Sequence, residues 1–83
     1  MTLITLYTTK GCTKCPAAKK LCREVAEETG SGYEEVDLEE HMIEALQRQI
    51  ASAPTIVINR EVAFRSVVPT KQELMSKIKE LSR

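Results

Sequence analysis

Two cysteines three positions apart, Cys12 and Cys15, are the residues whose types and spacing most directly suggest chemistry. Residues three apart in a helical turn lie on one face, with Cα atoms roughly 5 to 6 Å apart, inside the range that a disulfide requires. The pair could therefore transfer electrons by opening and closing a disulfide. It could equally supply two thiolate ligands to a metal such as zinc.

The residues around Cys12 favour redox chemistry. The apolar pattern that follows predicts a helix beginning near Cys12, and a helix N-terminus stabilises a thiolate. Lys10 and Lys14 add nearby positive charge, although both could also be ordinary solvated lysines. Cys15, one turn deeper, is placed to attack the mixed disulfide that Cys12 forms. Pro16 suits a first helical turn, where its missing N–H has no partner to lose.

The metal alternative needs two further ligands. Cys22 and His41 could nominally complete a Cys₃His set, but structural zinc sites usually take their second pair at similarly close spacing. Cys22 lies two turns after Cys15, roughly 10 Å along a helix axis, which is too far for a disulfide within the helix. We expect Cys22 to be a small buried apolar residue and His41 to be solvated.

Composition limits the classes of function. With 83 residues and 42% hydrophobic content, the chain predicts a single domain over residues 1–83. Twelve basic and twelve acidic residues cancel, so we expect no nucleic-acid or membrane partner. We also expect a monomer. The first residues lack the features of a signal peptide, which predicts a cytoplasmic location. Three cysteines in that reducing compartment are a poor structural disulfide framework.

Strand and helix patterns alternate along the chain. Strands are predicted over residues 3–7, 33–38, 55–58 and 61–65. Helices are predicted over residues 12–28 and 39–51, with a third starting near residue 70. The order βαβαββα predicts an α/β fold in which helices cover a four-stranded sheet and the most apolar strands, 3–7 and 55–58, lie in its middle.

Two local signals sharpen this map. Asn59 and Arg60 are predicted to join the last two strands in a tight hairpin. The third helix is announced by a capping box, in which Thr70 and Glu73 each accept a hydrogen bond from an otherwise unpaired backbone N–H. Its predicted buried stripe is Leu74, Ile78 and Leu81.

With these motifs in place, the chain resembles small glutaredoxin-like and thioredoxin-like dithiol proteins. LYTTKGCTKCP resembles the glutaredoxin active-site run, and SAPTIVIN resembles the cis-proline segment and the strand after it. The resemblance implies a thioredoxin fold with a central four-stranded mixed sheet and three flanking helices. It also implies that Cys12 is the nucleophile, Cys15 the resolving thiol, and Lys10 a group that supports the thiolate or binds glutathione. Ala53 and a cis Pro54 would pair with the substrate chain.

The sequence also departs from both patterns. It has no tryptophan, carries Thr13-Lys14 between the cysteines, and lacks the Gly-Gly turn that glutaredoxins use to bind glutathione. These departures favour thioredoxin-like activity on protein disulfides, with weak glutathione binding. Thr13 and Tyr7 are predicted to flank the substrate site, with core packing as the favoured alternative for Tyr7.

The resulting hypothesis is a thiol–disulfide oxidoreductase that reduces disulfide-containing proteins without cofactor or metal. Its electron donor would be a thioredoxin-reductase-like enzyme or a low-molecular-weight thiol. Two alternatives stay open: a metal-binding or metallochaperone domain that uses the same thiolates, and a non-catalytic adaptor with the thioredoxin fold.

Overall fold

A computed structural model of the chain describes residues 2–81, and its elements follow the predicted order βαβαββα. The strands are β1 (Leu3–Thr8), β2 (Gly32–Asp37), β3 (Thr55–Ile58) and β4 (Glu61–Arg65). The helices are α1 (Cys15–Thr29), α2 (Met42–Gln47) and α3 (Lys71–Leu81). The predicted elements are therefore all present, and the differences lie at their ends.

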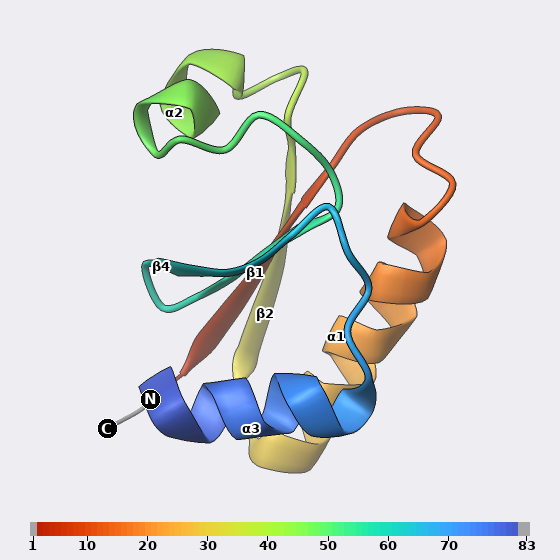
Figure 1. Cartoon of the computed structure of the whole chain (residues 1–83), viewed down its shortest axis with the longest axis vertical. Helices are drawn as coiled ribbons and strands as arrows, with labels where there is room; N and C mark the ends of the chain where they lie inside the picture. Colours follow the sequence, from red (N-terminus) through yellow and green to blue (C-terminus); the bar gives the residue numbers. More distant parts are fainter. Residues whose placement is uncertain (1, 82–83) are drawn as a thin grey trace.

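The four strands form a mixed sheet in the order β2-β1-β3-β4 (Figure 1). β1 pairs parallel with β2 and antiparallel with β3, and β4 pairs antiparallel with β3. The apolar strands β1 and β3 thus occupy the middle of the sheet and the more charged strands its edges, as the sequence predicts. All four residues of β3 are buried, in keeping with its continuous apolar run.

Helices cover both faces of the sheet (Figure 1). Because side chains alternate along a strand, successive residues of β1 and β3 enter two separate cores. The core under α1 and α3 consists of Ile4, Leu6, Ala18, Cys22, Val25, Ala26, Ile56, Ile58, Leu74 and Ile78. The smaller core on the α2 side consists of Tyr7, Leu38, Ala45, Ile50 and Val57.

The second helix is shorter than predicted, covering residues 42–47 and not 39–51. It ends in a Schellman motif: Gln49 adopts a positive φ of 62°, and the Ile50 N–H donates to the Ala45 carbonyl at 2.8 Å. Ile43 and Leu46 are 76% and 55% exposed, whereas Ala45 and Ile50 are buried. Ile43 and Leu46 therefore lie in the helix and Ile50 in the turn after it. Their helical spacing does not define one buried helix face.

Both local signals of the C-terminal half are confirmed. The hairpin between β3 and β4 turns at Asn59, which adopts a positive φ of 61°. In the capping box, the Thr70 N–H donates to Glu73 Oε1 at 3.0 Å and the Glu73 N–H donates to Thr70 Oγ1 at 3.1 Å. These bonds fix the start of α3, whose residues Leu74 and Ile78 are buried.

Candidate active site

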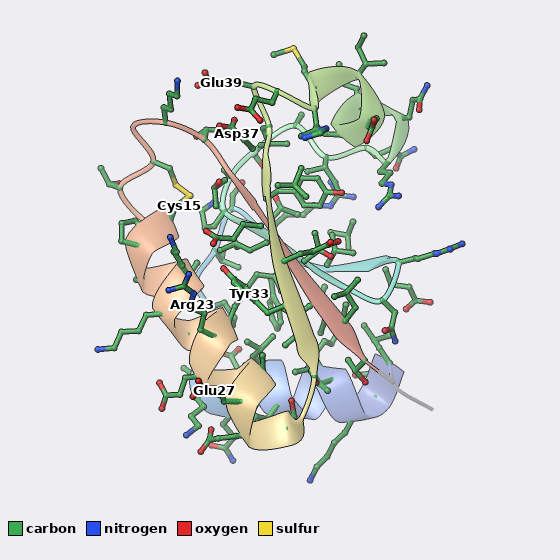
Figure 2. The ribbon with its side chains drawn as sticks, turned by 180° about the vertical axis from the view of Figure 1, so that it is seen from behind. Cys15, Arg23, Glu27, Tyr33, Asp37 and Glu39 are labelled. Atoms are coloured by element: carbon green, nitrogen blue, oxygen red, sulfur yellow. A yellow bond between two sulfur atoms is a disulfide. The ribbon has the colours of Figure 1, made fainter. Side chains whose placement is uncertain are left out.

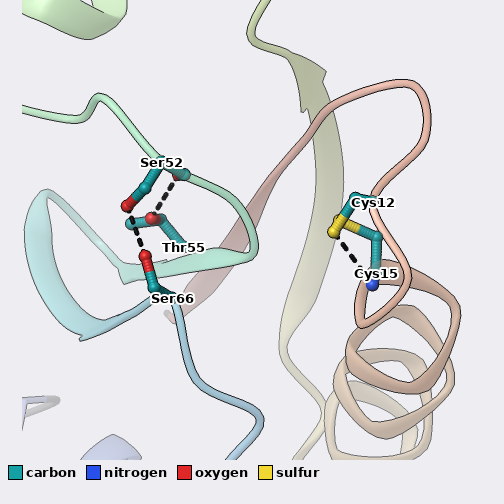
Figure 3. The surroundings of a disulfide bond; sticks show 5 residues. All are labelled: Cys12, Cys15, Ser52, Thr55 and Ser66. Atoms are coloured by element: carbon teal, nitrogen blue, oxygen red, sulfur yellow. Dashed lines mark hydrogen bonds between the residues drawn. A yellow bond between two sulfur atoms is a disulfide. The ribbon is translucent and has the colours of Figure 1, made fainter.

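Cys12 and Cys15 form a disulfide where the chain passes from β1 into α1 (Figure 3). Their Cα atoms lie 5.4 Å apart, as the spacing predicts and as a disulfide requires. Cys15 is only 7% exposed, whereas Cys12 is half-buried and more accessible. An incoming sulfur atom therefore meets Cys12 first.

The predicted start of the first helix was wrong by three residues. α1 begins at Cys15 and not near Cys12, with Lys14 as its N-cap and Pro16 in its first turn. The Lys14 side chain makes no capping hydrogen bond. The Cys15 N–H instead donates to Cys12 Sγ at 3.1 Å, so the sulfur atom takes the place of a capping oxygen. The N-terminal end of α1 thus acts on Cys12 through this contact, and both the N–H and the helix dipole favour a thiolate there.

Lys10 and Lys14 flank the disulfide, and both are exposed. Neither forms an ion pair with another residue of the described range 2–81. Thr13, between the two cysteines, is exposed as well. All three side chains are therefore accessible from solvent beside Cys12, and their predicted roles stay predictions.

The segment before β3 lies at the same end of the sheet as the cysteine loop. Tyr7 of β1 pairs with Thr55 of β3, so the carboxyl end of β1 adjoins the residues that precede β3. The peptide bond between Ala53 and Pro54 is cis, as the resemblance to the family implies. Pro54 is buried, and Ala53 is partly exposed. The topology therefore brings the two predicted parts of the site together.

Sequence analysis did not identify the hydroxyl groups that hold this segment (Figure 3). Thr55 Oγ1 donates to the Ser52 carbonyl at 2.7 Å, and the Ser66 N–H donates to the Pro54 carbonyl at 2.8 Å. The hydroxyl groups of Ser66 and Ser52 are joined by a hydrogen bond of 2.6 Å. The one sequence signal was the absence of glycine after the hairpin, where Ser66 adopts a positive φ of 57°.

An apolar hollow of about 210 Å³ adjoins this end of the sheet. Its lining joins the loop after β1, the α2 region and the segment that leads to Pro54, and includes Thr9, Leu38, Met42, Leu46, Ile50 and Ala51. Met42 and Leu46 are each more than half exposed. The site is therefore bordered by lysines on the α1 side and by apolar side chains on the α2 side.

Tyr7 lies beneath this end of the sheet and not on its surface. It is 4% exposed and belongs to the core on the α2 side of the sheet, where its hydroxyl accepts a hydrogen bond from the Arg48 guanidinium at 3.4 Å. This is the placement of a packing residue, the alternative that the sequence favours.

Cys22 is fully buried on the inner face of α1, as predicted. Burial, with a smaller contribution from the Glu35 carboxylate, raises the pKa of the Cys22 thiol to about 12. Glu35 lies between Lys19 and Arg23, at 3.4 and 3.8 Å, on the seam between α1 and β2. Figure 2 shows Arg23 beside Tyr33 on this seam. Cys22 is therefore a neutral core residue.

The Cys₃His arrangement finds no support in the geometry. His41 is exposed at the N-terminus of α2, 3.9 Å from Glu44, and Cys22 is buried under α1. Within residues 2–81, no group of three or more His, Cys, Asp or Glu side chains is arranged to hold a metal ion. Nor does any helix of that range combine the length and apolar character needed to cross a membrane.

A four-stranded mixed sheet with three helices, carrying a Cys-x-x-Cys disulfide at a helix start and a cis-proline, defines a thiol–disulfide oxidoreductase of the thioredoxin fold. The chain belongs to the thioredoxin domain family, whose model matches residues 2–79. It is 39% identical over 79 residues to a thioredoxin from Methanocaldococcus jannaschii, a match that covers 93% of this chain and 92% of that protein.

Solved structures confirm the fold at lower sequence identity. A variant thioredoxin from Halobacterium salinarum superposes with a TM-score of 0.82 at 18% identity, covering 99% of this chain and 75% of the other. The oxidised thioredoxin from Plasmodium falciparum gives a TM-score of 0.71 at 18% identity, covering 99% and 82%. These structures confirm the predicted fold class, and membership of the thioredoxin domain family confirms the predicted thiol–disulfide oxidoreductase activity.

Proposed function

We propose that this protein reduces disulfide bonds of protein substrates through a relay between Cys12 and Cys15. The observation that carries the proposal is the hydrogen bond from the Cys15 N–H to Cys12 Sγ, because it ties the more exposed sulfur to the positive end of α1. Lys10 and Lys14 lie on the same side and favour the thiolate further. Cys12 is thus the nucleophile and Cys15 the resolving thiol.

The relay transfers two electrons. The Cys12 thiolate attacks one sulfur of the substrate disulfide, forming a mixed disulfide and releasing one substrate thiolate, which takes up a proton. Cys15 then loses its proton and attacks Cys12 Sγ, which forms the Cys12–Cys15 disulfide and releases the second substrate thiolate. The substrate is reduced by two electrons, and the protein is oxidised by two.

We assign substrate docking to the end of the sheet where the cysteine loop and the segment before β3 lie. We infer that the backbone at Ala53, before the cis Pro54, pairs with an extended substrate segment while Thr13 contacts it from the cysteine loop. The adjoining apolar hollow suits a polypeptide side chain better than the small polar glutathione. Tyr7 supports this end of the sheet by packing beneath it.

The cycle closes when an external donor reduces the Cys12–Cys15 disulfide. A thioredoxin-reductase-like enzyme or a low-molecular-weight thiol fits this step. As a reductant, the couple should have a potential of roughly −200 to −270 mV, between the thioredoxin and glutaredoxin values. A monomer in the reducing cytoplasm, carrying electrons to disulfide-containing proteins, is consistent with an odd number of cysteines, of which Cys22 is free and buried.

Cysteine substitutions test this assignment. Cys12→Ser should lower the rate of insulin reduction by dithiothreitol to the rate measured without the protein, because the accessible nucleophile is lost. Cys15→Ser should accumulate a mixed disulfide between Cys12 and the insulin chain, seen as an adduct by mass spectrometry. Cys22→Ala is the matched control and should retain insulin reduction. A Cys12→Ser protein that still accelerates insulin reduction above the protein-free rate would contradict the relay.

A further inference from the structure

The segment around the cis-proline is tied to the segment after β4 by a hydroxyl–hydroxyl bond. Ser52 Oγ and Ser66 Oγ lie 2.6 Å apart, and the two residues are separated by 14 positions in the chain (Figure 3). We refer to this contact as the Ser52–Ser66 bridge. A second link, between the Arg65 guanidinium and the Gln49 carbonyl, joins the same two segments.

Ser66 stands where glycine would be the easiest residue to accommodate. Its φ of 57° lies in the left-handed region, which L-residues other than glycine, asparagine and aspartate seldom occupy. Its side chain is exposed, so it fills no core space. The contact that a glycine could not make is the hydroxyl bond to Ser52. The bridge is therefore a contact that depends on a serine at this position.

The bonds around the bridge hold both sides of the Ala53–Pro54 peptide. Before it, Ser52 is bound through its hydroxyl to Ser66 and through its carbonyl to Thr55 Oγ1. After it, the Pro54 carbonyl accepts the Ser66 N–H at 2.8 Å. Thr55 is fully buried in β3, so its hydroxyl is a fixed anchor. Ala53 therefore lies between two residues whose backbone or side chain is hydrogen-bonded.

We propose that Ser52 and Ser66 are positioning residues that preorganise the Ala53 backbone for protein substrates. This inference rests on the proposed function, in which that backbone pairs with the substrate chain. Preorganisation strengthens binding by lowering the ordering cost that a flexible loop would add. The bridge should therefore matter for substrates that contact Ala53. It should not matter for a small disulfide that meets only Cys12.

The test compares two substrates on two single variants, their double variant and two control variants. Ser52→Ala and Ser66→Gly each remove the bridge, and Ser66→Gly also relieves the left-handed φ. The rate at which the reduced protein is oxidised is measured by acid quench, alkylation and mass spectrometry against increasing insulin and, separately, against hydroxyethyl disulfide. We expect the second-order rate constant for oxidation by insulin to fall about three- to tenfold, as for loss of one hydrogen bond, because insulin binds more weakly.

The same measurements contain the controls. The rate with hydroxyethyl disulfide should change less than about twofold, as for an ordinary surface substitution. The double variant should behave like either single one, because both remove the same bond. Ser52→Thr keeps the hydroxyl and should restore insulin kinetics. Asn59→Gly, at the positive-φ residue of the distant hairpin, controls for placing glycine at such a position and should leave insulin kinetics unchanged.

The proposal is overturned if both single variants keep insulin kinetics within about twofold of the starting protein. It is also overturned if the rates with insulin and hydroxyethyl disulfide fall together, since the bridge would then act on the cysteine pair. Failure of the proposed function is a different result: the unsubstituted protein itself would not be oxidised by insulin.

Discussion

Cys12 and Cys22 carry the same thiol group, yet the fold gives them opposite chemistry. Cys12 is half-buried, lies beside two exposed lysines and accepts an N–H from the start of α1. Cys22 is fully buried, and burial raises the pKa of its thiol to about 12. Because the thiolate is the nucleophile, the reactivity of the two residues should differ greatly.

Alkylation of the reduced protein measures this difference. With iodoacetamide at pH 8, Cys12 should be modified first, whereas Cys22 should stay unmodified until the protein is unfolded by guanidinium chloride. The reason is that Cys22 stays protonated and out of contact with the reagent. Peptide mass spectrometry after timed quenching gives the order. Modification of Cys22 in the folded protein at a rate similar to Cys12 would contradict its placement in the core.

A substitution at a second single residue, Tyr33, tests how a buried hydroxyl group affects the stability of the fold. Its hydroxyl is buried and has no hydrogen-bond partner among residues 2–81. Burial, followed by the Glu35 carboxylate, raises the pKa of Tyr33. A buried polar group without a partner costs about 1 to 3 kcal/mol. Tyr33→Phe removes that group and should leave the free energy of unfolding unchanged or raise it.

Urea unfolding followed by circular dichroism checks the Tyr33 prediction. Tyr7→Phe is the matched control, because the Tyr7 hydroxyl has Arg48 as a partner. It should show a small loss of stability where Tyr33→Phe shows none. A loss of more than about 1 kcal/mol for Tyr33→Phe would mean that its hydroxyl makes a stabilising hydrogen bond.

Among the elements, α3 is the one whose start is fixed by residues close to each other in the sequence. Thr70 and Glu73 satisfy each other's backbone N–H groups, and both residues are visible in the sequence. Thr70→Ala removes the acceptor for the Glu73 N–H and should cost about 1 kcal/mol. For a chain of this length, that loss lowers the melting temperature by about 4 to 8 °C. Ser76→Ala, on the exposed face of α3, is the control and should change it little.

The capping box should also respond to pH. The backbone N–H of Thr70, followed by its side chain, lowers the pKa of the Glu73 carboxyl below its ordinary value of 4.5. Because the folded pKa is the lower one, the stabilisation is fully present above the unfolded value and is lost as pH falls through the folded one. Glu73→Ala should therefore lower the melting temperature at pH 7, with a smaller difference in stronger acid. An equal difference at both pH values would show that the carboxylate charge plays no part.

The ends of α1 and α2 show what a pattern in the sequence leaves out. The helical spacing around residues 12–15 could not reveal that a sulfur atom replaces the capping side chain, so α1 starts later than predicted. In α2, Ile43 and Leu46 fit a helical repeat but are exposed, because Gln49 ends the helix and turns Ile50 into the core. Both ends depend on backbone geometry and not on residue type alone.

On the scale of the whole molecule, the order of the elements and the apolar strands predicted an α/β sheet and its middle strands, whereas the thioredoxin fold was predicted from resemblance to a family. β1 and β3 are the most apolar strands and lie side by side in the middle of the sheet. This pairing places the cysteine loop and Pro54 at the same end of the sheet. The cysteine pair could be found from spacing, and the cis bond only from resemblance to a family. The Ser52–Ser66 bridge could not be predicted, because it joins distant residues of an ordinary type through a rare backbone conformation.

The proposed relay requires that Cys12 and Cys15 form a reversible couple and that Cys22 takes no part. The most direct measurement is a redox titration of the purified protein in dithiol/disulfide buffers, with thiols trapped by alkylation and counted at each cysteine by mass spectrometry. We expect Cys12 and Cys15 to oxidise together as a two-electron couple, at roughly −200 to −270 mV, while Cys22 stays reduced. Failure of Cys12 and Cys15 to form a disulfide, or protection of all three thiols by a bound metal, would contradict it.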